Sequence, residues 1–135
     1  MAKFVLTDAS LVINSVDLSD HVASVTLELN SEEIDTTAMG STFMSKTGGL
    51  KSGTLSIDFQ QDFASSEVDA TMFPLFGGTT AFVLKATSGS VSATNPSYSG
   101  SILVNQHIPV ANAVGELATM SVSFPTSGTV TRATS

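Results

Sequence analysis

One stretch of the sequence, TLSIDFQ at residues 54–60, alternates strictly between polar and apolar side chains. Leu55, Ile57 and Phe59 fall on one side of an extended chain, and the polar residues between them fall on the other. A period of two is that of a β-strand with one face in a core and one polar face. The segment therefore predicts a half-buried strand, which requires other strands beside it.

The rest of the chain supplies those strands. Residues 22–30 and 117–125 alternate in the same way, and shorter apolar runs are separated by turn signals such as Asn14-Ser15. Residues 66–74 instead predict a short helix, with Ser66 and Asp69 as a capping box and Pro74 at its end. We predict a mainly β protein, a β-sandwich or barrel of about seven or eight strands with one short flanking helix. At 135 residues it forms a single domain, residues 1–135.

The segment SEEIDTTAMGSTFMSKTGGLKSG, residues 31–53, has no sustained periodicity. It contains four glycines, which lower the cost of irregular backbone conformations. We expect a long mobile loop in its middle.

Composition and charge exclude several classes of function. Charged residues make up 13%, about half of the usual quarter, and serine and threonine fill the difference. The net charge is −7, and the five cations are scattered, so there is no basic patch for nucleic acid. There is no cysteine, and no apolar run predicts a signal peptide or a membrane span. The low surface charge predicts that other copies cover much of the surface.

Catalytic and metal-binding patterns are weak. Asp17, Asp20 and His21 carry two carboxylates and an imidazole within five residues, which suits a hard metal ion or acid/base chemistry. The same residues are ordinary turn chemistry between two apolar runs, and no further ligand is identified. His107 lies beside Asn105 on the polar side of an expected strand. This position predicts a solvated or interface histidine. We predict no catalytic residue, no metal site and no cofactor.

Glu32, Glu33 and Asp35 form a local acidic cluster. Such a run is usually a solvated face, and its more specific interpretation is a docking site for cations. Lys46 and Lys51 lie just downstream, so the loop of one subunit is a candidate to meet the acids of another. Complementary charges of this kind set register more than affinity.

The order of these motifs resembles that of a known family. The motifs are, in order, LVINSVDLSDHVASVTLELNSEEIDTTAMG, a strand, SSEVDATMFPLFGG and further strands. With these motifs the chain is similar to the tail tube (major tail) proteins of long-tailed bacteriophages, particularly small ones of actinobacterial phages. The similarity extends from about Val5 to Arg132, and the order of the motifs carries it. The resemblance implies a structural virion protein that is not an enzyme, with a tail-tube β-sandwich fold.

The resemblance also implies an assembly. Hexameric rings would stack into a hollow tail tube, made in the host cytoplasm, with tape-measure and tube-end proteins as partners and no membrane. Genomic DNA would pass through an acidic lumen without specific binding. The loop near residues 37–50 would reach the adjacent ring, with candidates Gly40, Phe43, Lys46, Gly48, Gly49 and Lys51. Candidates for the lumen lining are the polar residues of two alternating strands: Ser24, Thr26, Glu28, Asn30, Thr54, Ser56, Asp58 and Gln60.

Two other classes of function remain open from the sequence. A head-decoration or head–tail connector protein of a virion has the same β-rich, weakly charged composition. A carbohydrate-binding β-sandwich normally displays aromatic platforms, whereas this chain has no tryptophan and one tyrosine, Tyr98. A tube protein forms filaments or stacked rings, and a connector stops at one ring.

Overall fold

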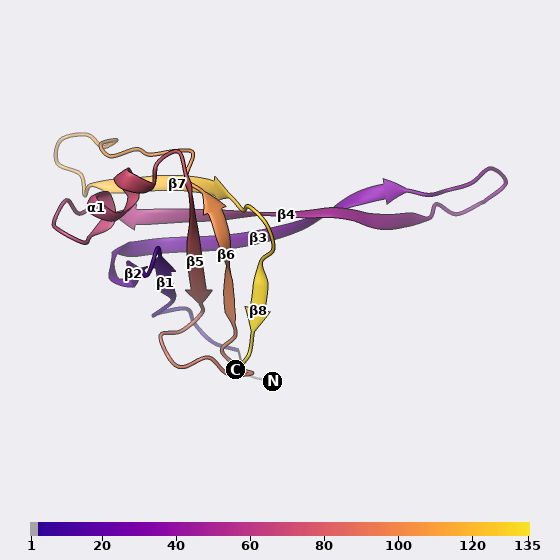
Figure 1. Cartoon of the computed structure of the whole chain (residues 1–135), viewed down its shortest axis with the longest axis horizontal. Coiled ribbons are helices and arrows are strands. Elements are labelled where there is room, and N and C mark those ends of the chain that lie inside the picture. Colours follow the sequence, from indigo (N-terminus) through magenta and orange to yellow (C-terminus); the bar gives the residue numbers. More distant parts are fainter. Residues whose placement is uncertain (1–2) are drawn as a thin grey trace.

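The structure is a computed structural model that describes residues 3–135. As predicted, it is mainly β, with eight strands in two antiparallel sheets and one short α-helix (Figure 1). The strands are β1 (Ser10–Ile13), β2 (Val16–Asp17), β3 (Val22–Asp35), β4 (Lys46–Gln60), β5 (Thr79–Lys85), β6 (Ser97–Leu103), β7 (Thr119–Pro125) and β8 (Thr131–Ala133). The helix is α1 (Val68–Met72), and two 3-10 turns, η1 (Ser19–His21) and η2 (Phe73–Leu75), accompany it. None of the helices within residues 3–135 has the length and apolarity needed to cross a membrane.

The two sheets pack face to face. One has the order β2-β1-β5-β6-β8 and the other β3-β4-β7, and their strands cross steeply (Figure 1). The β1–β2 hairpin turns at Asn14 and Ser15, whose φ angles of 51° and 64° give a primed turn that matches the strand twist. The turn that the sequence predicted at these two residues is thus confirmed.

The core lies between the sheets and is closed at one end by α1. Leu55, Ile57 and Phe59 of β4 are fully buried, as are the alternating apolar residues of β7 that pair with them. The opposite sheet contributes its own buried side chains, and Val68 and Met72 of α1 are also fully buried. The predicted apolar face of residues 54–60 and the shared face of Val68 and Met72 are therefore confirmed. The apolar face predicted for residues 117–125 is confirmed from Thr119 onward, whereas Leu117 and Ala118 precede β7 and are exposed.

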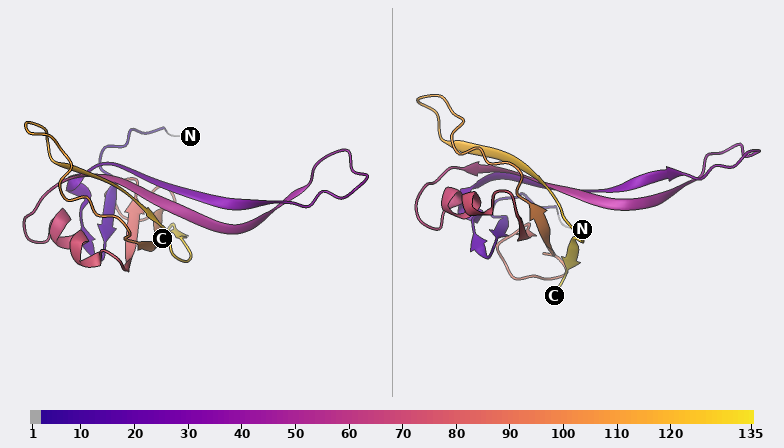
Figure 2. Two further views of the ribbon diagram at one scale, coloured as in Figure 1. Left: turned by 90° about the horizontal axis from the view of Figure 1, so that it is seen from above. Right: turned by 45° about the horizontal axis from the view of Figure 1, so that its top comes forward.

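The β3–β4 hairpin extends far beyond this core as an arm (Figures 1 and 2). The two strands pair from Val22–Phe59 out to Asp35–Lys46, and only residues 36–45 form the connecting loop. Residues 46–50, which the sequence suggested as loop, belong to β4.

The glycines of this segment serve close packing in the strand. A Cβ atom on Gly53 would lie 2.8 Å from Leu29 Cδ2 and 3.1 Å from the carbonyl oxygen of Glu28. A Cβ atom on Gly49 would lie 2.8 Å from Ile34 Cδ1. Side chains of β3 thus lie across Gly49 and Gly53 of β4, so these two glycines, which had suggested a mobile loop, instead make room for a cross-strand neighbour.

Two local predictions were wrong. The helix does not begin with a capping box at Ser66: Glu67 is the N-cap and makes no side-chain capping hydrogen bond, and Ser66 has a φ of 62°. The backbone N–H of Asp69 is instead satisfied by the carbonyl of Asp62 in the preceding loop. The expected strand that was to carry Asn105 and His107 ends before them: β6 ends at Leu103, after which the chain leaves the sheet.

Gly53 provides a stability test of the arm's base. We expect Gly53→Val to lower the stability by about 1–3 kcal/mol, because the new side chain overlaps Leu29 and the β3 backbone. Thermal unfolding followed by circular dichroism measures the change. Gly89→Ala is a control for glycine loss, since its Cβ atom would meet other atoms only at ordinary contact distances of 3.6 and 3.9 Å. An unchanged melting temperature for Gly53→Val would contradict the packing described here.

Candidate assembly surfaces

A polar face covers the outer side of the three-stranded sheet. The register pairs Ser24 with Asp58, Thr26 with Ser56 and Glu28 with Thr54, so the two rows that the sequence predicted lie side by side. Ser24 Oγ donates a hydrogen bond to Asp58 Oδ2 at 2.9 Å, which places both side chains on this face. We call it the polar face; its candidates are Ser24, Thr26, Glu28, Asn30, Thr54, Ser56, Asp58 and Gln60.

β7 extends the polar face with residues that we had not singled out. Ser123 pairs with Ser56, with the two hydroxyl oxygens 2.9 Å apart, and Ser121 pairs with Asp58. The alternation of residues 117–125 carried the signal for both serines, because their side chains must point away from the buried Met120 and Val122. Among the face residues named here the charged ones are Glu28 and Asp58, both acidic.

The two outer strands of this sheet differ. β7 is partly covered by the loop of residues 104–118. Gln106 Oε1 accepts a hydrogen bond from the Ser123 amide at 3.3 Å, and Asn112 Oδ1 accepts one from the Thr119 amide at 2.8 Å. No strand of the described residues 3–135 pairs with the outer edge of β3, which runs from Val22 to Asp35. A long unpaired edge invites pairing with another chain.

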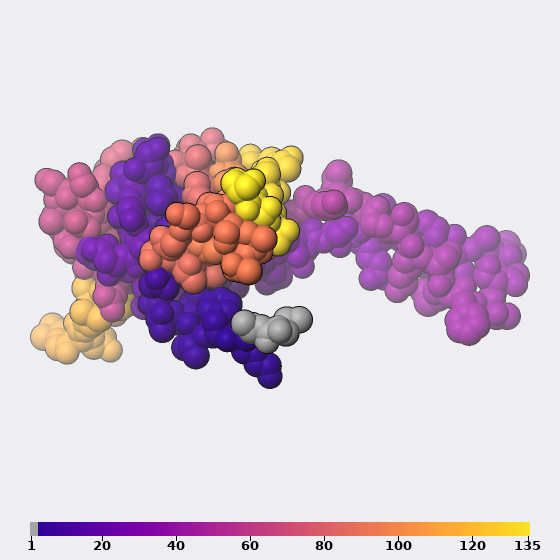
Figure 3. Space-filling model, turned by 90° about the horizontal axis from the view of Figure 1, so that it is seen from below, coloured from indigo at the N-terminus to yellow at the C-terminus, as the bar shows by residue number. Residues whose placement is uncertain are grey.

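The arm carries the second surface. Its loop exposes large apolar side chains, with Met39 at 102%, Phe43 at 87% and Met44 at 67% of their full accessible area. The space-filling view shows the arm standing clear of the body (Figure 3). We call Met39, Phe43 and Met44 the apolar tip. Phe43 was named from the sequence as a loop candidate, but the two methionines were not. Their place in the same loop could have identified them.

The charged residues of the arm lie close to one another within the same hairpin. Lys46 forms an ion pair with Glu33, and in the register it is opposite Asp35. Lys51 is opposite Ser31, one residue before Glu32. The geometry thus gives Lys46 an acidic partner in its own chain, while docking of these charges between subunits stays a prediction.

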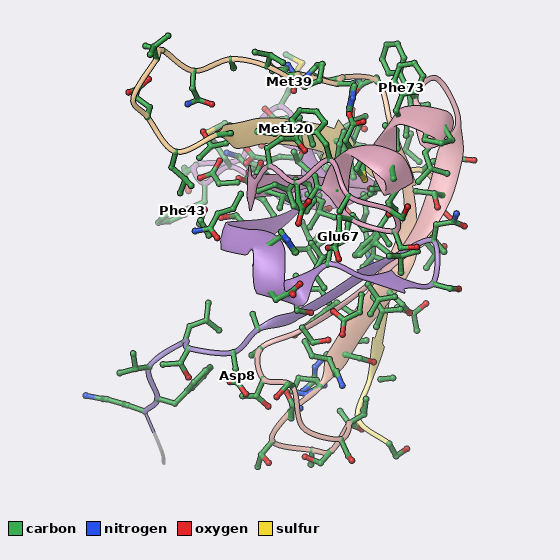
Figure 4. The ribbon with its side chains drawn as sticks, turned by 90° about the vertical axis from the view of Figure 1, so that its left-hand side faces the viewer. Asp8, Met39, Phe43, Glu67, Phe73 and Met120 are labelled. Atoms are coloured by element: carbon green, nitrogen blue, oxygen red, sulfur yellow. The ribbon has the colours of Figure 1, made fainter. Side chains whose placement is uncertain are left out.

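A cluster of carboxylates surrounds His21 at the end of the body away from the arm. His21 Nδ1 lies 2.8 Å from Asp20 Oδ1 and 3.3 Å from Glu67 Oε2, and Nε2 lies 2.9 Å from Asp62 Oδ2. Asp17 is not part of this cluster: its carboxylate accepts hydrogen bonds from the amide and hydroxyl of Ser19, which is the turn that the sequence favoured. Glu67, just before α1, lies near the middle of the view in Figure 4.

These contacts favour protonated His21. Partial burial opposes the charge, but hydrogen bonds to Asp20 and Asp62 and the nearby charge of Glu67 outweigh it and raise the pKa of His21. The pKa of Asp62 is lowered, first by the amide of Ala64 and then by His21. The cluster therefore joins η1 to the loop before α1 as an ion-paired group.

The prediction of a solvated His107 was wrong. Its side chain is only 5% exposed, its Nε2 lies 3.2 Å from Asp69 Oδ1, and its ring lies against Phe73 and Phe76. Because the chain leaves the sheet at Leu103, strand alternation no longer says which way His107 points. The buried pair ties the loop of residues 104–118 to α1.

The raised pKa of His21 predicts a pH-dependent stability. The stabilisation is fully present below the ordinary histidine pKa near 6.5 and is lost as the pH rises through the raised native value. We expect the free energy of unfolding of the wild type to fall over this range by more than that of His21→Gln. Denaturant titrations between about pH 5.5 and 8.5 measure it. Equal slopes for the two proteins would contradict the charged cluster.

We expect EDTA to leave the melting temperature unchanged. Ligand atoms of Asp20, His21 and Glu67 lie within 4.8 Å of one another, the spacing of a possible metal site. Carboxylates, however, already contact both ring nitrogens of His21, and a protonated imidazole cannot ligate a metal. Thermal unfolding with and without chelator is the measurement. A large drop with EDTA, restored by zinc, would instead assign a metal ion to these residues.

Comparison with known proteins places this fold. No family model and no curated protein matches the chain. A chain in the virion of a native gene transfer agent particle matches 93% of this chain and 95% of its own length, with a TM-score of 0.73 and 15% identity. A chain in the tail of an empty gene transfer agent particle, solved with helical refinement and C6 symmetry, matches 82% of this chain and 81% of its own, with a TM-score of 0.65 and 16% identity. Chains with a similar fold are thus found in the virion and in the tail of gene transfer agent particles.

Proposed function

We propose that this protein is a structural subunit of a phage-like tail tube, in which six copies form a ring and rings stack around an acidic lumen. The observation that carries the proposal is the unpaired edge of β3 beside a continuous polar face, in a fold shared with a tail of C6 symmetry. Pairing of that edge with a neighbouring copy would join the polar faces around a channel. The order of the sequence motifs supports a tube of the long-tailed phage kind, with an actinobacterial phage as its source.

The polar face suits a channel wall. Its side chains are hydroxyls, amides and two carboxylates, Glu28 and Asp58, so it presents hydrogen-bonding groups without positive charge. A wall of this kind repels phosphates, and DNA passes without the counterion release that a basic wall would cause. The net charge of −7 per chain supports the same role.

The arm suits contact between rings. Its residues 36–45 stand clear of the body and expose the apolar tip. Contact with another copy would cover this tip, which is favourable for a protein of such low charge. Tape-measure and tube-end proteins would meet the inside and the ends of the tube. The role is structural, without catalysis or a cofactor.

Electron microscopy of the purified protein tests the proposal. We expect stacked rings or filaments of uniform width, with sixfold symmetry in end views, at high protein concentration. Single rings that never stack would instead support a head–tail connector, and monomers at every concentration would support a head-decoration protein or reject the assembly altogether.

A further inference from the structure

Two apolar surfaces lie at opposite ends of the molecule's long axis. The apolar tip is at one end, and the loop of residues 104–118 with α1 is at the other (Figures 1 and 3). At this second end Val110 is 80% exposed, Val114 106% and Phe63 60%. Figure 4 looks at this end of the molecule, with Phe73 at its upper edge.

The second end contains a recess of about 170 Å³. Its wall is mainly apolar, with two polar residues, Asn112 and Glu116, beside Phe63, Pro109, Val110, Ala111, Ala113 and Ala118. An apolar cavity of about 150 Å³ accommodates a benzene molecule. The recess therefore has the size and chemistry to receive one phenyl ring.

Hydrogen bonds build the recess before any partner arrives. Gln61 Nε2 donates to the carbonyl of Pro109 at 3.1 Å, and Asn112 bonds both the amide and the hydroxyl of Thr119, at 2.8 and 3.2 Å. Glu116 Oε1 accepts from the amide of Ala113 at 2.8 Å. A preorganised wall loses little conformational entropy when a partner binds, which favours a specific contact.

We propose that Phe43 at the apolar tip of one copy inserts into this recess of a second copy in the next ring of the tube. The inference rests on the proposed function and names the surface that receives the arm. The apolar tip and the recess that receives it lie at opposite ends of one chain, so the contact between two copies is heterologous. It repeats from ring to ring without closing, which produces an open filament. Each contact covers the apolar tip of one copy and the recess of the next, so repetition of this one type of contact covers both apolar surfaces of every copy inside the tube.

Crosslinking tests the contact directly, because the chain has no cysteine of its own. In the variant Thr42→Cys/Val114→Cys, which keeps Phe43, a short bis-maleimide should join tip to recess rim in assembled tubes and give a ladder of covalent species longer than six subunits. Both positions are exposed in the single chain, so folding should be unaffected. The matched control is Thr42→Cys/Ser90→Cys, whose second cysteine is exposed in a different loop and should give no ladder.

The outcomes separate this inference from the proposed function. If wild-type tubes form but the Val114 variant gives no ladder, a ladder that stops at six, or the same ladder as the Ser90 control, the docking is overturned and the tube stands. If no wild-type tubes form, the proposed function itself fails.

A second variant fills the recess instead of labelling it. Ala111→Trp should block stacking while rings still form, whereas Ala93→Trp, an exposed alanine outside the recess, should stack normally. Electron microscopy counts rings and filaments for both. Normal filaments from Ala111→Trp would overturn the docking.

Discussion

Replacing residues 31–51 by an Asn-Gly turn is expected to give a folded protein that no longer forms tubes. Asn30 and Ser52 are directly paired, so a two-residue primed turn can close the shortened hairpin there. The removed segment is almost entirely exposed, and we expect the melting temperature to stay within about 5 °C of the wild type. Circular dichroism checks the fold, and electron microscopy checks the assembly.

This design follows the observed hairpin rather than the loop expected from the sequence. Removal of residues 41–49 would shorten β4 and leave its partners on β3 unpaired, so a failure to stack would not report on the loop alone. Thr42→Ala, a polar change within the same loop, is the control and should assemble normally. Filaments of normal width and length from the shortened protein would show that the arm has no part in stacking.

Reversing the charge of the polar face is expected to make the tube hold DNA. In Glu28→Lys/Asp58→Lys each subunit loses two negative charges and gains two positive ones, so its net charge rises by four, which is 24 per ring of six copies. Lysines along the channel would bind phosphates with release of counterions, so labelled duplex DNA should sediment with preassembled tubes at low salt and dissociate as the salt concentration rises. Wild-type tubes should retain none. In the complete particle the same change should slow DNA ejection.

A charge-matched pair shows whether the position of the charge matters. Glu28→Gln/Asp58→Asn removes two negative charges from the polar face, and Ser90→Lys/Ala93→Lys adds two positive charges at exposed positions in the loop between β5 and β6. We expect the first variant to weaken the repulsion of DNA and the second to behave as the wild type. Equal DNA retention by Glu28→Lys/Asp58→Lys and by Ser90→Lys/Ala93→Lys, which introduces the same number of lysines, would place the polar face outside the channel.

The sequence by itself determined the strands whose faces alternate. Leu55, Ile57 and Phe59 are buried, and Ser56 and Asp58 lie on the other face of the same strand. This follows from the sequence because a period of two depends only on local backbone geometry. The same argument applied to β7 would have identified Ser121 and Ser123. The Asn14-Ser15 turn and the buried face of α1 are local in the same sense.

Only the tertiary structure decided what depends on residues far apart in the chain. Gly49 and Gly53 suggest flexibility until Ile34 and Leu29 of the partner strand are seen to lie across them. His21 meets Asp62 and Glu67 because the loop before α1 folds back onto η1. His107 is buried because its loop leaves the sheet and packs on η2, where alternation has no meaning. Each of these contacts joins segments that the pattern of neighbouring residues does not connect, so the arm, the recess and the histidine cluster could be recognised only in the folded chain.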